Sequence, residues 1–175
     1  MRRVVCHMAT SLDGFIAGPN GEIDWIVRDP TIDFTSIYSR FDAVLLGRRT
    51  YELTQQPGAP PWPAGWRIFV FSRTLVPAEH SGITVVSTNL GATVAGLQAE
   101  SGRDIWLFGG GTLFASFLAL DLIDEVEVAI MPVLLGGGIP LLSGAPRPSY
   151  LTLRSFEASQ GGIVNLRYDV QQPAG

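Results

Sequence analysis

A run of three glycines is the first place in this sequence where chemistry could occur. The apolar residues 106–108 lead into Gly109, Gly110 and Gly111, and a segment of helical character follows. Residues without a Cβ atom let a ligand approach the backbone, and the free amides at a helix N-terminus bind phosphate. The run lacks the G-x-G-x-x-G spacing and follows the fifth predicted strand, which disfavours a standard Rossmann site. A tight turn that only packs the helix on the sheet is the alternative.

Two other predicted strands end in arginine and hydroxyl side chains. Arg48, Arg49 and Thr50 follow one of them, and Ser72 and Arg73 end the next. Ligands of open α/β sheets bind beyond the carboxyl ends of the strands, where these side chains would emerge. Arginine binds phosphate oxygens bidentately, so the two strand ends suit the 2′-phosphate of NADP better than the free ribose of NAD. Ordinary solvated arginines are the alternative for each motif taken alone.

The other reactive residue types exclude several kinds of site. All twelve basic residues are arginine, and the absence of lysine excludes a P-loop and every Schiff-base mechanism. The only cysteine, Cys6, excludes an internal disulfide and a cysteine metal cluster, and its apolar neighbours predict a buried thiol. His7 and His80 are far apart in the sequence, so no metal site is expected.

Short apolar runs of strand length alternate with helical candidates along most of the chain. The predicted strands cover residues 3–10, 43–47, 67–72, 83–86 and 104–108, and the predicted helices cover residues 33–40, 48–53, 92–100 and 110–120. Such alternation indicates an α/β fold with a mostly parallel sheet. The Pro-rich residues 56–66 predict a surface loop between two of these elements.

The pattern changes beyond Asp121, where three further strands are predicted over residues 125–131, 150–158 and 163–170. In the last of them, polar Asn165, Arg167 and Asp169 alternate with apolar residues. Such alternation is typical of a strand with one wet face. We therefore expect an antiparallel C-terminal edge on the parallel sheet.

Length and composition limit the possible function classes. The 175 residues predict a single domain over residues 1–175, and 46% hydrophobic against 16% charged residues argues against disorder. The scarcity of charge also suggests that a partner covers part of the surface. A net charge of −4 favours neither nucleic acid nor an anionic membrane. The first twelve residues are too short and too polar for a signal peptide or a membrane span, so a cytoplasmic protein is expected.

The order of the motifs resembles that of the dihydrofolate reductase superfamily. It is more closely similar to the reductase domain of the riboflavin-biosynthesis deaminase/reductase and to its stand-alone relatives. The likeness runs from residue 3 to about residue 143 and rests on residues 11–14, 47–51, 71–73, 108–111 and 129–142. The last strands match in pattern only. The resemblance implies a three-layer α/β/α fold with a mostly parallel eight-stranded sheet, an antiparallel C-terminal edge, and NADPH bound across the carboxyl edge.

The resemblance also implies which residues contact the cofactor. Three positions border the nicotinamide, two strand ends hold the phosphates of the adenosine half, and the glycine turn holds the pyrophosphate. In the family, the peptide bond that corresponds to Gly109-Gly110 is cis. The implied cofactor residues are Ala9, Ile16, Ala17, Gly47, Arg48, Arg49, Thr50, Phe71, Ser72, Arg73, Gly109, Gly110, Gly111, Thr112 and Leu113.

Substrate residues are implied less directly. Dihydrofolate reductase uses a carboxylate on its first long helix to hold the pterin and to assist proton delivery. Asp33 is the nearest candidate, and a plain helix N-cap is its alternative; Asp13 is a second candidate that could instead close an Asx turn. Trp25 would lie near the substrate mouth or act as a lid packed on the sheet. Phe108 and His7 point to the substrate position, although a histidine in a central strand is often a satisfied core residue.

These observations lead to one main hypothesis about function. It is an NADPH-dependent reductase that transfers hydride to a small heterocycle, such as a pyrimidine, a pterin or a related lactam. The alternative is a catalytically idle module of the same fold that binds a nucleotide or another ligand. The apolar residues 130–142, and the pairing of similar domains through their C-terminal strands, predict a two-fold homodimer.

Overall fold

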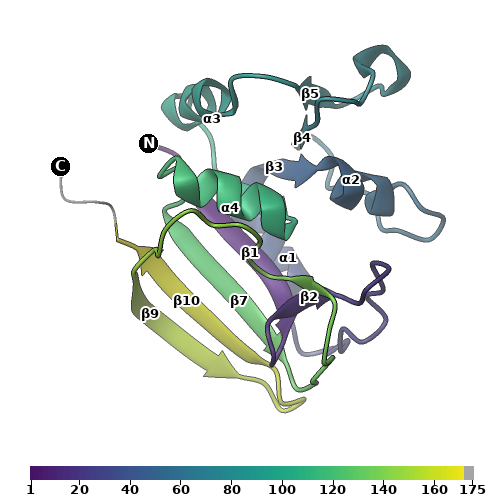
Figure 1. Ribbon diagram of the computed structural model, residues 1–175, viewed down its shortest axis with the longest axis vertical. Helices are drawn as coiled ribbons and strands as arrows, with labels where there is room; N and C mark the ends of the chain where they lie inside the picture. Colours follow the sequence, from purple (N-terminus) through teal and green to yellow (C-terminus); the bar gives the residue numbers. More distant parts are fainter. Residues whose placement is uncertain (172–175) are drawn as a thin grey trace.

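An eight-stranded sheet forms the centre of the molecule, in the strand order β5-β4-β3-β6-β1-β7-β10-β9 (Figure 1). It is seen in a computed structural model that describes residues 1–171. The strands of this sheet are β1 (Val4–Ser11), β3 (Phe41–Gly47), β4 (Arg67–Phe71), β5 (Thr84–Val86), β6 (Asp104–Gly109), β7 (Glu125–Met131), β9 (Leu151–Ala158) and β10 (Val164–Val170).

Strand direction divides the sheet into two parts. Strand β1 runs parallel to both of its neighbours, β6 and β7, and the strands from β5 to β3 continue the parallel arrangement. Strand β10 runs antiparallel to β7 and to the edge strand β9. The prediction of a mostly parallel sheet with an antiparallel C-terminal edge is therefore confirmed.

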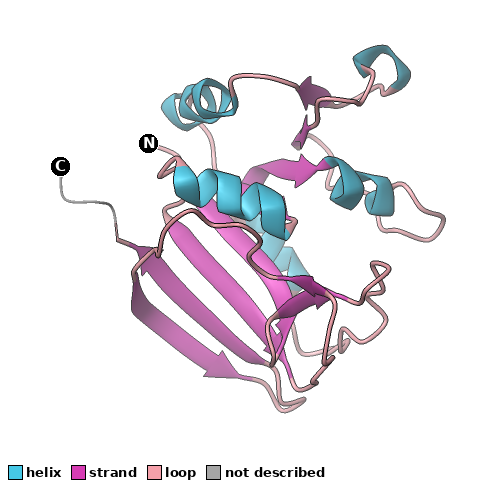
Figure 2. Cartoon of the chain, viewed as in Figure 1, coloured by secondary structure: helices cyan, strands magenta, loops and turns pink. Residues whose placement is uncertain are grey.

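Helices cover both faces of the parallel part and complete the three layers (Figure 2). Helices α3 (Leu90–Ala99) and α4 (Gly111–Ala119) pack on one face, while α1 (Phe34–Ser39) and α2 (Arg48–Thr54) pack on the other. Successive side chains of a strand point to opposite faces. Cys6 accordingly lies in the core beneath α3 and α4, and Val5 lies in the core beneath α1 and α2.

The core beneath α1 and α2 is rich in aromatic side chains. Phe41 stacks on Trp106 with ring centroids 5.3 Å apart, and Tyr51 of α2 is buried in the same cluster. Trp62 and Trp66 of the Pro-rich segment also pack against this cluster. The prediction that residues 56–66 form a surface loop is confirmed, and the two indole rings anchor this loop on the sheet.

Three short elements were not predicted. Strands β2 (Phe15–Ala17) and β8 (Ile139–Pro140) form a small antiparallel sheet, and η1 (Pro77–Glu79) is a single 3₁₀ turn. Elements of two or three residues are too short to show a period in the sequence. Because β2 comes early in the chain, the glycine turn follows the sixth strand rather than the fifth. The β2-β8 sheet brings the chain back beside the start of α4 (Figure 1).

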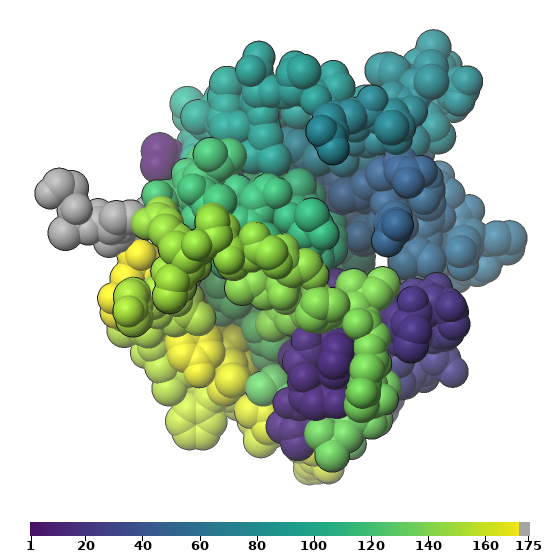
Figure 3. All heavy atoms as spheres, in the orientation of Figure 1, coloured from purple at the N-terminus to yellow at the C-terminus, as the bar shows by residue number. Residues whose placement is uncertain are grey.

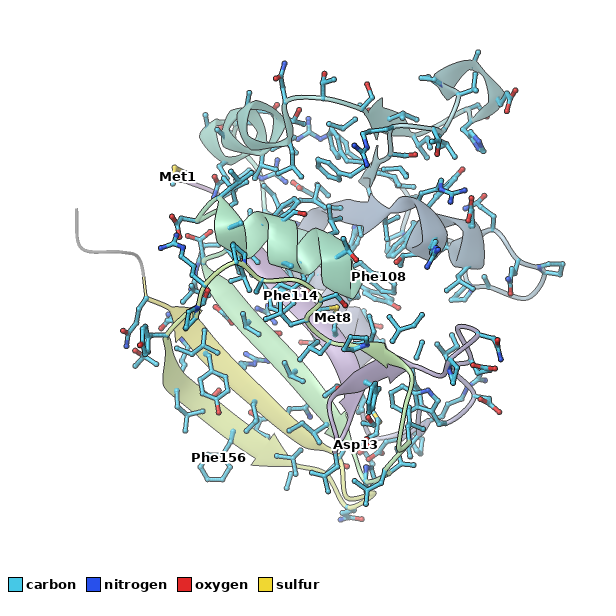
Figure 4. The ribbon with its side chains drawn as sticks, in the orientation of Figure 1. Met1, Met8, Asp13, Phe108, Phe114 and Phe156 are labelled. Carbon is cyan, nitrogen blue, oxygen red and sulfur yellow. The ribbon has the colours of Figure 1, made fainter. Side chains whose placement is uncertain are left out.

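The antiparallel edge has an uncovered apolar side. Leu153 of β9 is 50% exposed and Phe156 is 70% exposed, and both lie on the face of the sheet that carries α4. Figure 4 shows Phe156 projecting from the outer strand, away from the helices. On the opposite side, Arg167 and Asp169 form ion pairs with charged neighbours.

None of the helices within residues 1–171 is long and apolar enough to cross a lipid bilayer.

Candidate active site

A cavity of about 1380 Å³ opens beyond the carboxyl ends of β1, β3, β4 and β6. Strands β3 and β6 are neighbours in the sheet, and the helices that follow them, α2 and α4, leave toward opposite faces. Such a change of direction creates a crevice in which ligands of open α/β sheets bind. Figure 3 shows the surface indented between the purple N-terminal segment and the blue segment that contains α2.

The glycine turn between β6 and α4 forms the floor of this cavity. The Gly109-Gly110 peptide bond is cis, as the resemblance implied. A Cβ atom on Gly111 would lie 2.5 Å from the carbonyl oxygen of Pro140, and one on Gly109 would lie 2.7 Å from the sulfur of Met8. No side chain caps the N-terminus of α4, and Gly110 and Gly111 line the cavity. Gly109, with a φ of +111°, and Gly111 therefore have to be glycine, and the start of α4 faces the cavity.

Arginine side chains gather at the end of the cavity beyond β3 and β4. Arg48, Arg49 and Arg73 all line it, and Arg48 forms an ion pair with Glu52 at 3.1 Å. Within residues 1–171, Arg49 and Arg73 make no ion pair. Ser72 Oγ accepts hydrogen bonds from the amides of residues 74 and 75, which fixes the turn that carries Arg73. Unpaired cations beside a helix N-terminus suit an anionic ligand.

Small and apolar residues line the cavity between the glycine turn and β1. Ala9, Ile16 and Ala17 contribute to this wall, and Cδ1 of Ile16 lies 3.6 Å from the Cβ position of Gly110. A flat ring can lie against such a wall, while the phosphates of the same ligand reach the start of α4 and the arginines. The residues present therefore fit a dinucleotide with additional phosphate charge, which is the chemistry of NADPH.

Aromatic residues form the opposite end of the cavity. Phe108 packs against Trp106 with ring centroids 5.1 Å apart and against Trp62 at 5.2 Å, and all three line the cavity. Figure 4 shows Phe108 beside the start of α4 and close to Met8. The indole nitrogen of Trp62 is buried and donates no hydrogen bond within residues 1–171.

His7 lies in the wall between these regions and is backed by buried charge. Its Nδ1 atom is 3.0 Å from Oε2 of Glu127, while Trp106 donates a hydrogen bond of 2.9 Å to its carbonyl oxygen. Arg40, at the end of α1, binds both oxygens of Glu127 at 2.9 and 2.6 Å. His7 reaches the cavity and Glu127 does not. Nδ1 is buried and its contact with Glu127 is not a well-aligned hydrogen bond, so a core histidine and a substrate contact both stay open for His7.

Glu127 and Glu125 are two residues apart on β7, and their pKa values are shifted in opposite directions. Burial raises the pKa of Glu125 to about 7, and its hydrogen bond with Glu127 adds to the shift. Burial also pushes the pKa of Glu127 upward, but the polar contacts with His7 and Arg40 outweigh it and lower this pKa. Glu127 is therefore the ionised member of the pair at neutral pH, and Glu125 is the member that holds a proton most readily.

Some residues proposed from the sequence lie outside the cavity. Asp33 is the N-cap of α1 and accepts a hydrogen bond of 3.1 Å from the amide of Ser36. Asp13 accepts hydrogen bonds from the Ser11 hydroxyl, which lowers its pKa most, and from two amides of the loop at residues 135 and 136. In Figure 4 it lies far from Phe108. Trp25 donates to a carbonyl oxygen three residues earlier. Neither aspartate lines the cavity, and neither does Trp25.

The other positions named from the sequence all line the cavity except Gly109, whose neighbours Gly110 and Gly111 do. The structure also brings in residues that sequence reasoning missed. The segment 87–90 is one further strand-to-helix junction at the carboxyl edge, so the rule that selected the arginines could have found it. No local signal marked Trp62 or Asn165. The cavity-lining residues that were not predicted as site residues include Arg28, Trp62, Trp106 and Asn165.

Two other reactive features lie apart from this site. Cys6 is buried, and burial raises the pKa of its thiol well above the usual value, so it is not a reactive thiolate. In the part of the chain from residue 1 to residue 171, no three His, Cys, Asp or Glu side chains are grouped so that they could hold a metal ion.

Comparison with known proteins identifies relatives along almost the whole chain. The family model of the RibD C-terminal domain matches residues 2–165. The uncharacterized protein YyaP of Bacillus subtilis is 33% identical over 178 residues, which is 95% of this chain and 94% of that protein. The riboflavin biosynthesis protein RibD of Corynebacterium ammoniagenes is 27% identical over 154 residues. That match takes in 80% of this chain but 46% of the longer relative.

Solved structures show the same architecture. A putative riboflavin biosynthesis protein from Shewanella sp. PV-4 superposes with a TM-score of 0.84 at 29% identity, covering 98% of this chain and all of that one. The deaminase/reductase of Thermotoga maritima has the same fold, with a TM-score of 0.70 at 19% identity over 97% of this chain and 57% of that protein. With the family model matching nearly end to end, the chain belongs to the RibD C-terminal domain family.

Proposed function

We propose that this protein is an NADPH-dependent reductase that transfers hydride to a small heterocycle, such as a pyrimidine, a pterin or a related lactam. One observation carries the proposal most strongly. The uncapped start of α4, the unpaired Arg49 and Arg73, and a wall of small apolar residues all face one cavity at the change of direction between β3 and β6. This set of binding groups suits a phosphorylated dinucleotide.

The residues that would hold NADPH follow from their positions along the cavity. Gly47, Thr50 and the amides of residues 110–113 would surround the pyrophosphate, and Arg48, Arg49, Ser72 and Arg73, with Phe71 beside them, would take the adenosine phosphates. Ala9, Ile16 and Ala17 would border the nicotinamide. When bound there, the cofactor supplies a hydride ion. The protein supplies position, exclusion of water and a proton source.

The other end of the cavity favours an uncharged ring as substrate. Trp62, Trp106 and Phe108 offer aromatic side chains to a flat ring. Within residues 1–171, Arg28 is the only arginine that lines the cavity besides Arg48, Arg49 and Arg73. The sequence has no lysine that could bind a ribose phosphate. A substrate without a phosphate group fits these residues better than a phosphoribosyl compound.

A catalytically idle binding module is the second candidate, and one observation favours it. No aspartate or glutamate lines the cavity within residues 1–171, so the carboxylate expected from dihydrofolate reductase is missing there. Asp33 and Asp13 stay candidates for proton delivery only if the segment that carries them moves toward the substrate.

A binding measurement followed by an activity measurement separates the two candidates. Titration of protein fluorescence with NADPH and with NADH tests the cofactor site, and tighter binding of NADPH is expected. Oxidation of NADPH is then followed by absorbance with a panel of pterins, pyrimidines and quinones. Turnover of any member supports the reductase, whereas tight binding without turnover across the panel supports the idle module. Failure to bind NADPH contradicts both.

We also propose that the protein, acting as one domain over residues 1–175, forms a two-fold homodimer through its antiparallel edge. The exposed apolar side chains concentrate on β9, where Phe156 and Leu153 stand beside half-buried residues of β10. Such a patch on a folded protein marks a contact surface. Light scattering at micromolar concentration should give twice the chain mass, and a Phe156→Glu variant should give the monomer. A monomeric wild-type protein would contradict the proposal.

A further inference from the structure

A candidate proton source lies where β1 pairs with β7. We propose that His7 is the residue that protonates the substrate, and that Glu127 and Arg40 position it from behind the cavity wall. The inference rests on the proposed reductase function and goes beyond it by assigning the proton donor. It starts from a juxtaposition: a histidine in the cavity wall has a buried carboxylate 3.0 Å behind it, and that carboxylate is held by a bidentate arginine.

The orientation of the imidazole ring gives each nitrogen a different task. Nδ1 is buried and turned to Glu127, so Nε2 lies on the opposite edge of the ring. The His7 side chain is 19% exposed, and it reaches the cavity beside Trp106, whose ring centroid is 5.5 Å away. A carboxylate facing Nδ1 favours the tautomer of the neutral ring that carries its proton on that nitrogen. Nε2 is then the atom that exchanges a proton with a ligand.

Glu127 is held in its ionised form by groups from three elements. Arg40 comes from the end of α1, and Arg167 of β10 lies 3.6 Å from Oε1. On β7 itself, the neighbouring Glu125 is paired with Arg3 at 2.7 Å and Arg154 at 3.2 Å. The lowered pKa of Glu127 and the raised pKa of Glu125 agree with one fixed negative charge facing His7. Asn165 of β10 and Tyr38, whose ring centroid is 5.8 Å from that of Trp106, also line the cavity.

The proton step balances as follows. Hydride is added to an electrophilic carbon of a C=N or C=O group, and the electron pair of that double bond moves to the nitrogen or oxygen. His7 then breaks its Nε2–H bond, and the heteroatom forms a new N–H or O–H bond. The ring is left neutral, with its Nδ1–H facing Glu127, and it regains a proton from solvent through the open cavity. No further reactant is needed.

This arrangement explains how the site can work without a carboxylate in the cavity. Asp13 and Asp33 are engaged in a loop and in a helix cap, and neither lines the cavity. The carboxylate comes instead from β7, one strand beyond β1, and acts through the histidine between them. The register places His7 directly opposite Glu127 in the β1-β7 pair.

The first test observes the histidine rings and needs no substrate. The chain has two histidines, so nitrogen-15 NMR of the wild type and of a His80→Gln control assigns His7 without ambiguity. At alkaline pH, we expect the neutral His7 ring to carry its proton on Nδ1. In Glu127→Gln this preference should be lost, and a mixture of the two tautomers should appear. A His7 proton on Nε2 in the wild type would overturn the inference.

The second test uses matched substitutions and the first panel compound that the wild type reduces. His7→Asn keeps a donor toward Glu127 but removes Nε2, and its turnover should fall about 100-fold or more, with NADPH affinity unchanged. His80→Gln is the control and should keep wild-type turnover, since His80 lies outside the cavity. Glu127→Gln should lower turnover in the wild type but not in the His7→Asn background, because a positioning residue acts only through His7.

The outcomes separate this inference from the proposed function. A wild type that neither binds NADPH nor oxidises it with any panel compound contradicts the reductase, and the inference falls with it. A wild type that turns over while His7→Asn keeps more than a tenth of its rate contradicts the inference alone. If Glu127→Gln does not fold, His7→Asn and the tautomer of the wild-type ring still decide. Additive losses in the double variant would show that Glu127 is merely structural.

Discussion

Two regions of the molecule beside the cavity, its arginine end and the wall behind His7, carry charge in opposite ways. At the arginine end, Arg49 and Arg73 line the cavity and, within residues 1–171, have no carboxylate partner. Behind His7, the carboxylates of Glu125 and Glu127 are almost fully buried and are surrounded by arginines. Unpaired exposed cations add little to stability and are free to bind an anion. Buried paired charges are part of the fold, so removing one leaves its partner unsatisfied.

The largest effect on stability is expected for Glu127→Ala. This change leaves Arg40 and His7 without their shared carboxylate, and the free energy of unfolding should fall by about 3–5 kcal/mol. Urea denaturation measures the change. Arg49→Ala, at the arginine end, is the matched control and should shift stability by no more than about 0.5 kcal/mol. Equal effects of the two substitutions would remove the distinction between the two regions.

The second largest effect concerns cofactor affinity. Arg73→Ala should weaken NADPH binding by about 1.5–3 kcal/mol, because one charge-assisted contact to the 2′-phosphate is lost, and it should leave NADH binding nearly unchanged. Fluorescence titration with both cofactors checks this. Arg67→Ala, at the other end of β4, is the control, since Arg67 is paired with Glu100 at 2.5 Å and lies outside the cavity. Equal affinity of the wild type for both cofactors would contradict the prediction.

The buried glutamates should make stability depend on pH. The pKa of Glu125 is raised to about 7 in the folded protein, from an ordinary value of 4.5, so the folded state binds this proton more tightly than the unfolded state. Its contribution to the free energy of unfolding is full at pH values below 4.5, the pKa in the unfolded state, and is lost as pH rises toward 7. The loss should be about 1–2 kcal/mol, because nearby arginines and water screen the charge.

Denaturation at pH 5 and at pH 8 measures this loss as the difference between the two free energies of unfolding. The Glu125→Gln variant should lack this difference. Glu127 contributes in the opposite direction, since its lowered pKa stabilises the fold above its ordinary value and the contribution disappears in acid. A Glu125→Gln variant with the same dependence as the wild type over pH 5–8 would show that Glu125 is not the titrating group.

The smallest effect is expected within the arginine end itself. Arg48 already binds Glu52 four residues later on α2, whereas Arg49 has no such partner within residues 1–171. Arg48→Ala should therefore weaken NADPH binding by about 0.2–1 kcal/mol, less than Arg49→Ala. The same fluorescence titration compares the two variants. A larger loss for Arg48 would mean that the ion pair with Glu52 breaks when the cofactor binds.

Most of the sheet could be predicted from the sequence, and the reason is local. Apolar runs of strand length between turn residues located all strands except β2 and β8, and the strand over Glu125–Met131 was predicted with its observed bounds. The two missed strands have three and two residues, and they exist only because they pair with each other. Residues 56–66 form the predicted loop, but nothing local shows that Trp62 and Trp66 pack their rings against a distant strand.

The candidate site likewise contains residues that local geometry places and contacts that depend on the tertiary structure. The sequence by itself determined the residues at the strand ends, because a glycine turn before a helix and arginines after a strand act through local geometry. Only the tertiary structure decided that Asp33 caps a helix, that Trp62 reaches the cavity, and that Glu127 lies behind His7. The last of these contacts joins positions 120 residues apart through the pairing of β1 with β7. Strand pairing of that range depends on how the whole sheet packs, and no pattern within a short segment encodes it.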